Sequence, residues 1–298
     1  MSPRRNARAV ARVPLRPRGG PGRPTGGKRR ALGQHFLRDD QVVERIVALV
    51  RPTAADLVVE IGPGEGALTG RLAAAAGRFI ALEVDAALAS RLAARLPALP
   101  AAEVRHADAL QFDWTALPAL RPGGAGRILV VGNLPYSVGK PILMALTDAG
   151  PALAAAAPTE MAVMLQKEVA ERVAAPPGDR IYGSLSVLTQ IAADVRLAFT
   201  VPPGAFRPPP LVESAVLHLR ALAAPPVPVA DARHFRALVR AAFSQRRKSL
   251  ANALAAGLGL SAERARALLA SVGIDPGRRA ETLSLAEFAR VAAAESPG

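Results

Sequence analysis

The feature that most constrains the fold is an alternation of short apolar runs and helical segments through the middle of the chain. The runs 57–61, 79–83 and 128–132 predict buried strands, because they are continuous, apolar and bounded by glycine or polar residues. Such alternation predicts an α/β fold, with a mostly parallel sheet covered by helices on both faces. Ligands of such sheets bind beyond the carboxyl ends of the strands, where the strand order reverses.

The remaining segments extend the same pattern. Further strands are expected at 102–107, 160–166, 194–200 and 214–220. Helices are expected at 42–50, 68–76, 85–95, 138–149, 168–174 and 184–193. Later in the chain the pattern is purely helical, and Ser284 with Glu287 predicts a capping box. The expected regions are a basic arm at 1–30, an α/β domain at 31–222 and a small all-α domain at 223–298.

Positive charge is concentrated at the amino-terminal end. Residues 1–30 contain ten Lys and Arg and no acid, which leaves 28 of the 38 basic residues against 24 acidic ones in the rest of the chain. The arm is also rich in Pro and Gly, so we expect it to be disordered. Basic arms favour phosphate backbones, and an extension without any role is an equally good alternative.

Composition excludes several classes of protein. The chain has no cysteine, which rules out disulfides and thiolate metal sites, and its four His are scattered, so no metal site is expected. No apolar run reaches the length of a membrane span. We expect a monomeric protein of the cytoplasm that does not associate with membranes.

A glycine loop follows the strand at 57–61. Gly62, Gly64 and Ala67 lie in the spacing Gly-x-Gly-x-x-Ala, and Glu83 ends the next strand, 21 residues after Gly62. This pattern satisfies the dinucleotide-binding fingerprint. By itself it does not distinguish NAD from S-adenosylmethionine (SAM).

Charge near the loop favours SAM. Glu60 and Glu65 flank the loop and would repel a pyrophosphate, whereas SAM carries a sulfonium and an ammonium group. Glu83 is suited to the two ribose hydroxyls, and Asp108, after the third strand, to the adenine amino group. Ordinary strand-end carboxylates are the alternative interpretation of Glu83 and Asp108.

Asn133, Leu134, Pro135 and Tyr136 follow the apolar run at 128–132. The Asn side-chain oxygen and a carbonyl held by the proline can accept both hydrogens of an amine, and the tyrosine can stack on a base. The four residues resemble the motif of amino-methyltransferases that act on nucleic acid, and we take them as candidate catalytic residues. An ordinary strand-to-turn corner is the alternative.

Together these features resemble the ribosomal RNA adenine dimethyltransferase family, specifically its small-subunit (KsgA/RsmA) type. The resemblance covers about residues 30–295 and includes several further segments. They are Gly33–Leu37, Met164–Val169, Tyr182–Gly183, Val201–Phe206, Pro208–Pro210, Glu213–Val216 and Phe243–Lys248. The resemblance implies a Rossmann-like class I SAM-dependent methyltransferase that dimethylates the N6 amine of two adjacent adenosines near the 3′ end of 16S rRNA. The implied partner is the immature 30S subunit.

The resemblance also implies cofactor-binding residues. They are His35, Leu37, Gly62, Glu83, Asp108 and Asn133. The family usually has Asn at the position of His35. An imidazole can also donate and accept hydrogen bonds, so the contact can survive, and cofactor binding could become sensitive to pH.

A flipped adenine is expected to stack on Tyr136, with Phe206 covering its other face. The alternative for Phe206 is a side chain that fills the core. Arg246, Arg247 and Lys248 form a basic run in the helical domain, and we expect them to bind RNA. For each of these three residues taken singly, a solvated surface charge is the alternative.

Three other functions are alternatives for this sequence. The large-subunit (23S) adenine methyltransferases that confer antibiotic resistance share the expected fold and catalytic corner. A non-catalytic ribosome-assembly factor on the same fold is disfavoured by the intact Asn133 corner and Glu83. An NAD-dependent dehydrogenase is the most remote alternative, because no hydride-positioning acid–base group is evident.

Overall fold

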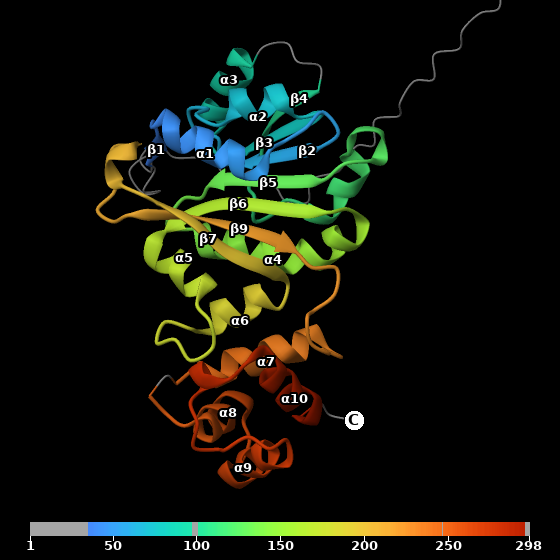
Figure 1. The fold of residues 1–298 in the computed structure, drawn as a ribbon, viewed down its shortest axis with the longest axis vertical. Coiled ribbons are helices and arrows are strands. Elements are labelled where there is room, and N and C mark those ends of the chain that lie inside the picture. Colours follow the sequence, from blue (N-terminus) through green and yellow to red (C-terminus); the bar gives the residue numbers. More distant parts are fainter. Residues whose placement is uncertain (1–34, 97–100, 246, 296–298) are drawn as a thin grey trace, which may run out of the picture. The chain divides into compact units, whose positions relative to one another are not determined.

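The computed structural model describes residues 35–96, 101–245 and 247–295 (Figure 1). The basic arm expected at 1–30 lies outside the described residues. The described residues belong to one compact unit, and the domain boundary expected between 222 and 223 stays a prediction. No helix within these ranges is both long enough and apolar enough to span a bilayer.

A single seven-stranded sheet forms the centre of the α/β part, with the strand order β4-β3-β2-β5-β6-β9-β7. Its strands are β2 (Leu57–Ile61), β3 (Arg78–Glu83), β4 (Ala102–His106), β5 (Ile128–Asn133), β6 (Thr159–Gln166), β7 (Ala193–Val201) and β9 (Ser214–Ala221). The neighbours from β4 to β6 are parallel, whereas β9 is antiparallel to both β6 and β7. The mostly parallel sheet expected from the sequence is confirmed.

Helices cover both faces of this sheet (Figure 1). They are α1 (Asp40–Val50), α2 (Thr69–Ala75), α3 (Ala86–Arg95), α4 (Gly139–Ala156), α5 (Lys167–Ala174) and α6 (Ser184–Gln190). Side chains alternate between the faces of a strand. Val58 therefore packs in the apolar cluster that contains α1 and α2. Its neighbour Val59 packs in the cluster that contains α4 and α5.

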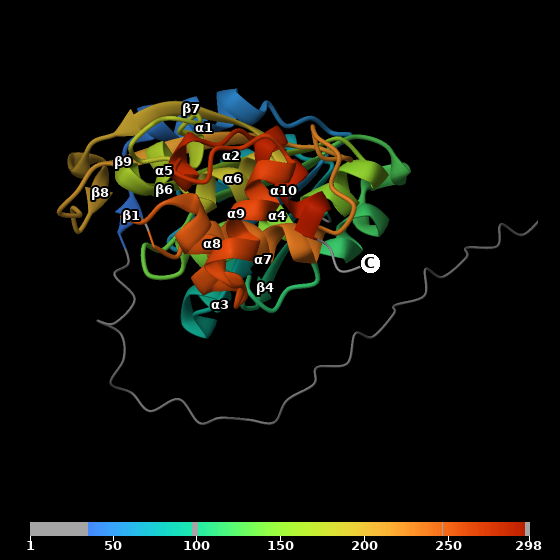
Figure 2. The same cartoon turned by 90° about the horizontal axis from the view of Figure 1, so that it is seen from below.

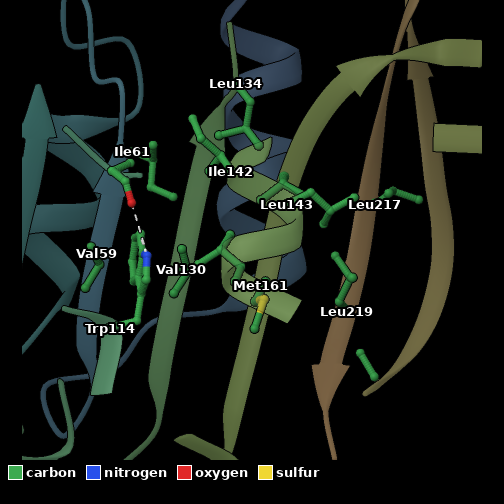
Figure 3. Close-up of a cluster of buried hydrophobic side chains, with 14 of the residues drawn as sticks. Val59, Ile61, Trp114, Val130, Leu134, Ile142, Leu143, Met161, Leu217 and Leu219 are labelled. Atoms are coloured by element: carbon green, nitrogen blue, oxygen red, sulfur yellow. Dashed lines mark hydrogen bonds between the residues drawn. The ribbon is translucent and has the colours of Figure 1, made fainter. Parts of the chain in front are cut away.

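The single tryptophan closes one edge of the α4-side cluster (Figure 3). Trp114 begins a 3-10 helix, η1 (Trp114–Leu120), and is only 5% exposed. Figure 3 shows its ring beside Val59 and Val130. Its indole N–H donates to the carbonyl of Ala109 at 3.1 Å, so the buried polar atom is satisfied.

The carboxyl-terminal helices share a separate cluster of buried apolar side chains with α6. Figure 2 shows these helices from below. They are α7 (Ala232–Ala242), α8 (Leu250–Leu258), α9 (Ala262–Ser271) and α10 (Leu285–Glu295). Ser284 and Glu287 form the predicted capping box. The backbone N–H of Ser284 donates to the Glu287 carboxylate at 2.8 Å, and that of Glu287 donates to the Ser284 hydroxyl at 3.2 Å.

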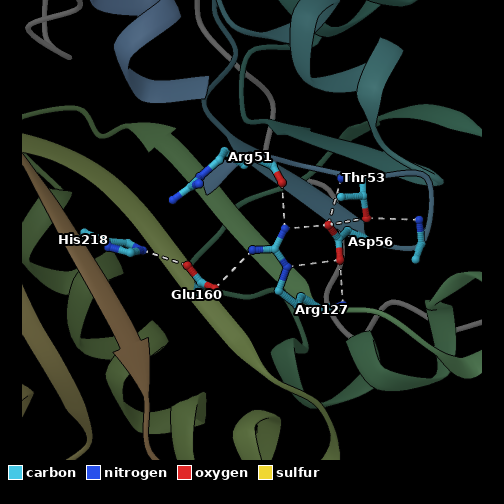
Figure 4. A network of polar contacts seen from close by, with 7 residues as sticks. Arg51, Thr53, Asp56, Arg127, Glu160 and His218 are labelled. Atoms are coloured by element: carbon cyan, nitrogen blue, oxygen red, sulfur yellow. Dashed lines mark hydrogen bonds and ion pairs between the residues drawn. The ribbon is translucent and has the colours of Figure 1, made fainter. Parts of the chain in front are cut away.

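A polar cluster joins the amino ends of the parallel strands (Figure 4). Arg127 donates to the buried carboxylate of Asp56 at 2.8 Å, to Glu160 at 3.2 Å and to the carbonyl of Arg51 at 2.8 Å. Glu160 also contacts His218 of β9 at 2.9 Å. This cluster therefore links β2, β5, β6 and β9 at the edge of the sheet opposite the carboxyl ends of its parallel strands.

Several features differ from the expected elements. Helix α6 ends at Gln190 instead of continuing to 193, and Ala193 already belongs to β7. Helix α4 continues to Ala156 instead of ending at 149, although Pro151 removes one backbone donor. Burial of Gly150 and Leu153 against the sheet holds this last part of the helix in place. A two-stranded ribbon also forms between β1 (Phe36–Leu37) and β8 (Phe206–Arg207), where the sequence indicated no strands.

Candidate active site

The glycine loop and the Asn133 corner lie side by side because β2 and β5 are neighbouring parallel strands. Ile61 pairs in register with Gly132, and the strand order reverses between β2 and β5. A Cβ atom added to Gly62 would lie 3.9 Å from the carbonyl oxygen of Asn133. The fold therefore brings the expected cofactor loop and the expected catalytic corner to one edge of the sheet.

The loop requires glycine for two different reasons. Gly62 and Gly64 have φ angles of +62° and +57°, which side chains other than glycine rarely adopt. A Cβ atom on Gly64 would also lie 2.9 Å from the ring of Phe36. Phe36, which sequence reasoning did not single out, therefore packs against the loop and fixes its position.

The carboxylate of Glu83 is held in place at the end of β3. It is 3% exposed, and its two oxygens accept the backbone N–H groups of Gly64 and Asp85, both at 3.0 Å. Each carboxylate oxygen has a second lone pair. The arrangement therefore fits a ribose whose two hydroxyls donate to Glu83, as expected for a SAM site.

Asp108 lies next to this carboxylate along the sheet edge. Glu83 pairs in register with His106, so Asp108 follows two residues beyond the partner of Glu83. One of its oxygens accepts the backbone N–H of Leu110 at 2.9 Å. This bond fixes the carboxylate where an adenine amino group is expected, and its contact with adenine stays a prediction.

The expectation that Glu60 repels a pyrophosphate is wrong. Its carboxyl is buried beneath the loop and accepts the hydroxyl of Thr69 at 2.7 Å. Burial raises its pKa to about 8, against the opposing effect of the Thr69 hydrogen bond and with a contribution from Glu83. Glu60 is therefore largely neutral at pH 7 and repels no phosphate. Glu65 forms an ion pair with Arg38, so SAM has to be assigned on other grounds.

The side chain of Asn133 is oriented by the backbone of His35. Its amide nitrogen donates to the His35 carbonyl at 2.9 Å, and a carbonyl can only accept. The Asn133 side-chain oxygen is therefore the atom that faces away from this bond and can accept an amine hydrogen. Leu134 is fixed by its backbone N–H, which donates to Met164 at 3.1 Å.

Tyr136 completes the corner and is half-buried. Its hydroxyl bonds Ser214 at 2.7 Å, and its ring lies 5.4 Å from that of His35. Burial raises the pKa of Tyr136, although the Ser214 bond acts in the opposite direction, so the phenol is neutral at pH 7. The His35 Nδ1 lies 2.8 Å from the carbonyl of Pro208, which requires a proton on that nitrogen.

Leu37 and Phe206 are more deeply buried than their expected roles require. The side chain of Leu37 is 5% exposed, so it could meet a cofactor only through its main chain. Phe206 pairs with Leu37 in the β1/β8 ribbon and is 1% exposed within an apolar cluster. The expected stacking of Phe206 on a base is therefore corrected, because in this structure its ring fills the core.

The basic run is only partly described. Arg247 and Lys248 are exposed between α7 and α8, whereas Arg246 lies outside the described residues. Arg236, on the neighbouring helix, is paired with Asp148 of α4. RNA binding by Arg246, Arg247 and Lys248 stays a prediction.

Comparison with known proteins decides between the enzyme classes that this site admits. The family model for ribosomal RNA adenine dimethylase matches residues 26–294. The chain belongs to the ribosomal RNA adenine dimethylase family.

Curated relatives and solved structures agree with this family. Ribosomal RNA small subunit methyltransferase A of Geobacter metallireducens is 45% identical over 267 residues, which cover 89% of this chain and 94% of that protein. The protein of the same name from Xanthomonas axonopodis pv. citri is 44% identical over 267 residues, which cover 90% of this chain and 96% of that protein. A dimethyladenosine transferase from Plasmodium falciparum has the same fold, with a TM-score of 0.68, 21% identity and coverage of 86% and 96%.

Membership of the ribosomal RNA adenine dimethylase family confirms three expectations. The fold is that of a Rossmann-like class I methyltransferase, the chain is an rRNA adenine dimethyltransferase, and its cofactor is SAM. The solved structure of the 23S rRNA methyltransferase ErmE is also similar, with a TM-score of 0.61, 25% identity and coverage of 87% and 98%. Fold alone therefore does not separate small-subunit from large-subunit enzymes.

Proposed function

We propose that this enzyme dimethylates the N6 amine of two adjacent adenosines near the 3′ end of 16S rRNA, on immature 30S subunits in the cytoplasm. The observation that carries the proposal is the Asn133 corner, whose amide is oriented by His35 beside the glycine loop. The small-subunit specificity is supported by relatives 44–45% identical over nearly their whole length. We further propose that it acts as a monomer and without a metal ion.

Positioning supplies most of the proposed catalysis. The oriented side-chain oxygen of Asn133 and the carbonyl of Leu134 accept the two hydrogens of the adenine amine, which directs its lone pair towards the glycine loop. Pro135 limits the motion of the Leu134 peptide, since its ring fixes the following φ angle. Bound SAM supplies an electrophilic methyl group.

Tyr136 acts in this scheme as a stacking surface and not as a base. Its phenol is neutral, because burial raises its pKa, and its hydroxyl is engaged with Ser214. Transfer of the methyl group from bound SAM to the amine would break the sulfur–carbon bond of the sulfonium and leave a neutral thioether, so the positive charge would pass to the amine nitrogen and make it acidic. Its proton can therefore leave to water, so the site needs no strong general base.

Substitution of Asn133 tests the proposal. For Asn133→Ala we expect methyl incorporation into small subunits that lack the modification to fall about 100-fold or more, the scale for one preorganised contact. The matched control is Asn133→Asp, which keeps the accepting oxygens but loses the bond to the His35 carbonyl. We expect this variant to retain more activity than Asn133→Ala. Near wild-type turnover of Asn133→Ala would refute the assigned role.

The acceptor subunit separates this proposal from its nearest alternative. Radiolabelled methyl groups should map to adjacent adenines of small-subunit RNA when unmodified 30S and 50S particles are offered together. Labelling of the 50S particle instead would favour the large-subunit type. Absence of labelling together with SAM binding, measured by isothermal titration, would favour a non-catalytic assembly factor.

A further inference from the structure

The loop between β8 and β9 carries the most exposed apolar side chain of the described residues. Leu211 is 102% exposed, and Val212 beside it is 46% exposed. The other large apolar side chains on the described surface are between 36% and 52% exposed; they are Val84, Leu110 and Leu197. A single exposed leucine needs no explanation, but the surroundings of Leu211 set it apart.

This loop is anchored on both sides of Leu211. On one side the carbonyl of Pro208 accepts a hydrogen bond from His35 at 2.8 Å, and Pro210 is buried. On the other side the carboxylate of Glu213 pairs with Lys167 at 2.6 Å. The three consecutive prolines at 208–210 restrict the backbone further. Leu211 is therefore held outward by a stiff loop, whereas a mobile loop could fold it away.

The chain is bonded to the candidate active site on both sides of Leu211. His35, whose ring bonds the carbonyl of Pro208, also accepts a hydrogen bond from the side-chain amide of Asn133 at its backbone carbonyl. Ser214, three residues after Leu211, bonds the hydroxyl of Tyr136 at 2.7 Å. Three residues of chain span at most about 10 Å. An apolar side chain is therefore fixed within reach of any RNA strand that delivers a base to the Asn133 corner.

We propose that Leu211, flanked by Val212, is a wedge that enters the RNA beside the target adenine and occupies the place that the flipped base leaves. This inference rests on the proposed function, and it makes Leu211 a positioning residue. Enzymes that act on a base must extrude it from its stack, and apolar side chains inserted between bases offset part of that cost. Burial of one leucine changes an equilibrium about 10- to 100-fold, which is enough to favour the flipped state.

The test compares full-length variants on small subunits that lack the modification. For Leu211→Ala we expect kcat to fall about tenfold, with an unchanged dissociation constant for SAM, because the wedge acts on base flipping. Leu211→Met keeps the apolar volume and should restore kcat to within about twofold. Leu197→Ala, an exposed leucine of β7, is the matched control and should behave as the wild type. Thermal unfolding should not change, since Leu211 has no buried surface.

Three results would overturn the wedge. One is a kcat of Leu211→Ala within twofold of the wild type. Another is a rise of KM alone, which would make the loop a docking contact for RNA or ribosomal protein. The last is failure of Leu211→Met to restore kcat. If the wild-type enzyme itself labelled no RNA, the proposed function would fail instead, so the two failures are distinguishable.

Discussion

Glu60 is the buried side chain whose ionisation is most altered by its surroundings. Burial raises its pKa from 4.5 to about 8, so the folded protein keeps a proton that the unfolded chain releases above pH 4.5. The stability that this proton contributes is fully present below pH 4.5 and is lost progressively as the pH rises from 4.5 to about 8. One such proton changes the free energy of unfolding by at most about 1.4 kcal/mol per pH unit.

Glu60→Gln should remove this dependence, because a neutral amide can still accept the hydroxyl of Thr69. Urea unfolding at pH 6 and at pH 8.5 measures the effect. We expect the variant to gain stability relative to the wild type at the higher pH. The exposed ion-pair residue Glu44, changed to Gln, serves as the control. Equal pH slopes for Glu60→Gln and the wild type would contradict the assignment.

At the residue scale, the sequence identified those residues whose position in the fold follows from their place next to a predicted strand. Gly62 and Gly64 lie in the loop that follows the buried strand β2, and Asn133 is the last residue of the buried strand β5, so their places at the sheet edge could be predicted. For Phe206 the sequence left both base stacking and burial in the core open, and it did not indicate the neutral state of Glu60. The burial of Phe206 and the neutral state of Glu60 depend on long-range packing, which no local spacing records.

At the scale of the elements, helices α7 and α8 pack closely together at Gly257, where a larger residue would not fit. A Cβ atom on Gly257 of α8 would lie 2.5 Å from the Cβ of Ala241 on α7. Helix propensity alone would favour Ala over Gly by up to about 1 kcal/mol. Overpacking costs about 1–3 kcal/mol, so the clash should outweigh this gain.

Gly257→Ala should therefore lower the free energy of unfolding by up to about 2 kcal/mol, the overpacking cost less the full gain in helix propensity. The matched control is Gly70→Ala in α2, where nothing lies within 4 Å of an added Cβ atom. The same change there should stabilise the protein slightly. Chemical denaturation of both variants gives the comparison, and stabilisation by Gly257→Ala would contradict the proposed close contact.

The short ribbon of β1 and β8 shows why some elements escaped sequence analysis. Each strand has two residues, too few for a pattern of alternation, and Phe36 pairs with Arg207 across 171 positions of the chain. By contrast β2 and β5 have five and six residues and nearly continuous apolar runs. The elements that could be predicted are therefore those with an apolar pattern in their own residues. The β1/β8 ribbon forms because of tertiary contacts between distant parts of the chain.

At the scale of the whole molecule, the Arg127 cluster stabilises the edge of the sheet that lies opposite the active site. Burial tends to raise the pKa of Asp56, but hydrogen bonds from Arg127 and Thr53 outweigh it and the pKa is lowered. Removal of Arg127 would leave a buried carboxylate without its cation. Loss of one partner from such a pair costs about 3–5 kcal/mol.

Arg127→Ala should therefore lower the free energy of unfolding by about 3–5 kcal/mol. Where the protein remains folded, SAM affinity should be unchanged, since the cluster lies at the opposite ends of the parallel strands. Arg105→Ala is the control, because within the described part of the chain Arg105 pairs only with its near neighbour Glu103, at 2.8 Å. Guanidinium unfolding and isothermal titration give both readouts. A loss below about 1 kcal/mol would show that the pair is as weak as a surface ion pair.

The position of β9 between β6 and β7 has a consequence for biosynthesis. A ribosome makes β7 before β9, so β7 emerges without the only strand that it pairs with in this sheet. Ser214, which bonds Tyr136, opens the strand that fills this gap. Co-translational folding can therefore assemble the glycine loop early. The candidate catalytic corner therefore gains the bond between Ser214 and Tyr136 only after β9, which ends at Ala221, has left the exit tunnel.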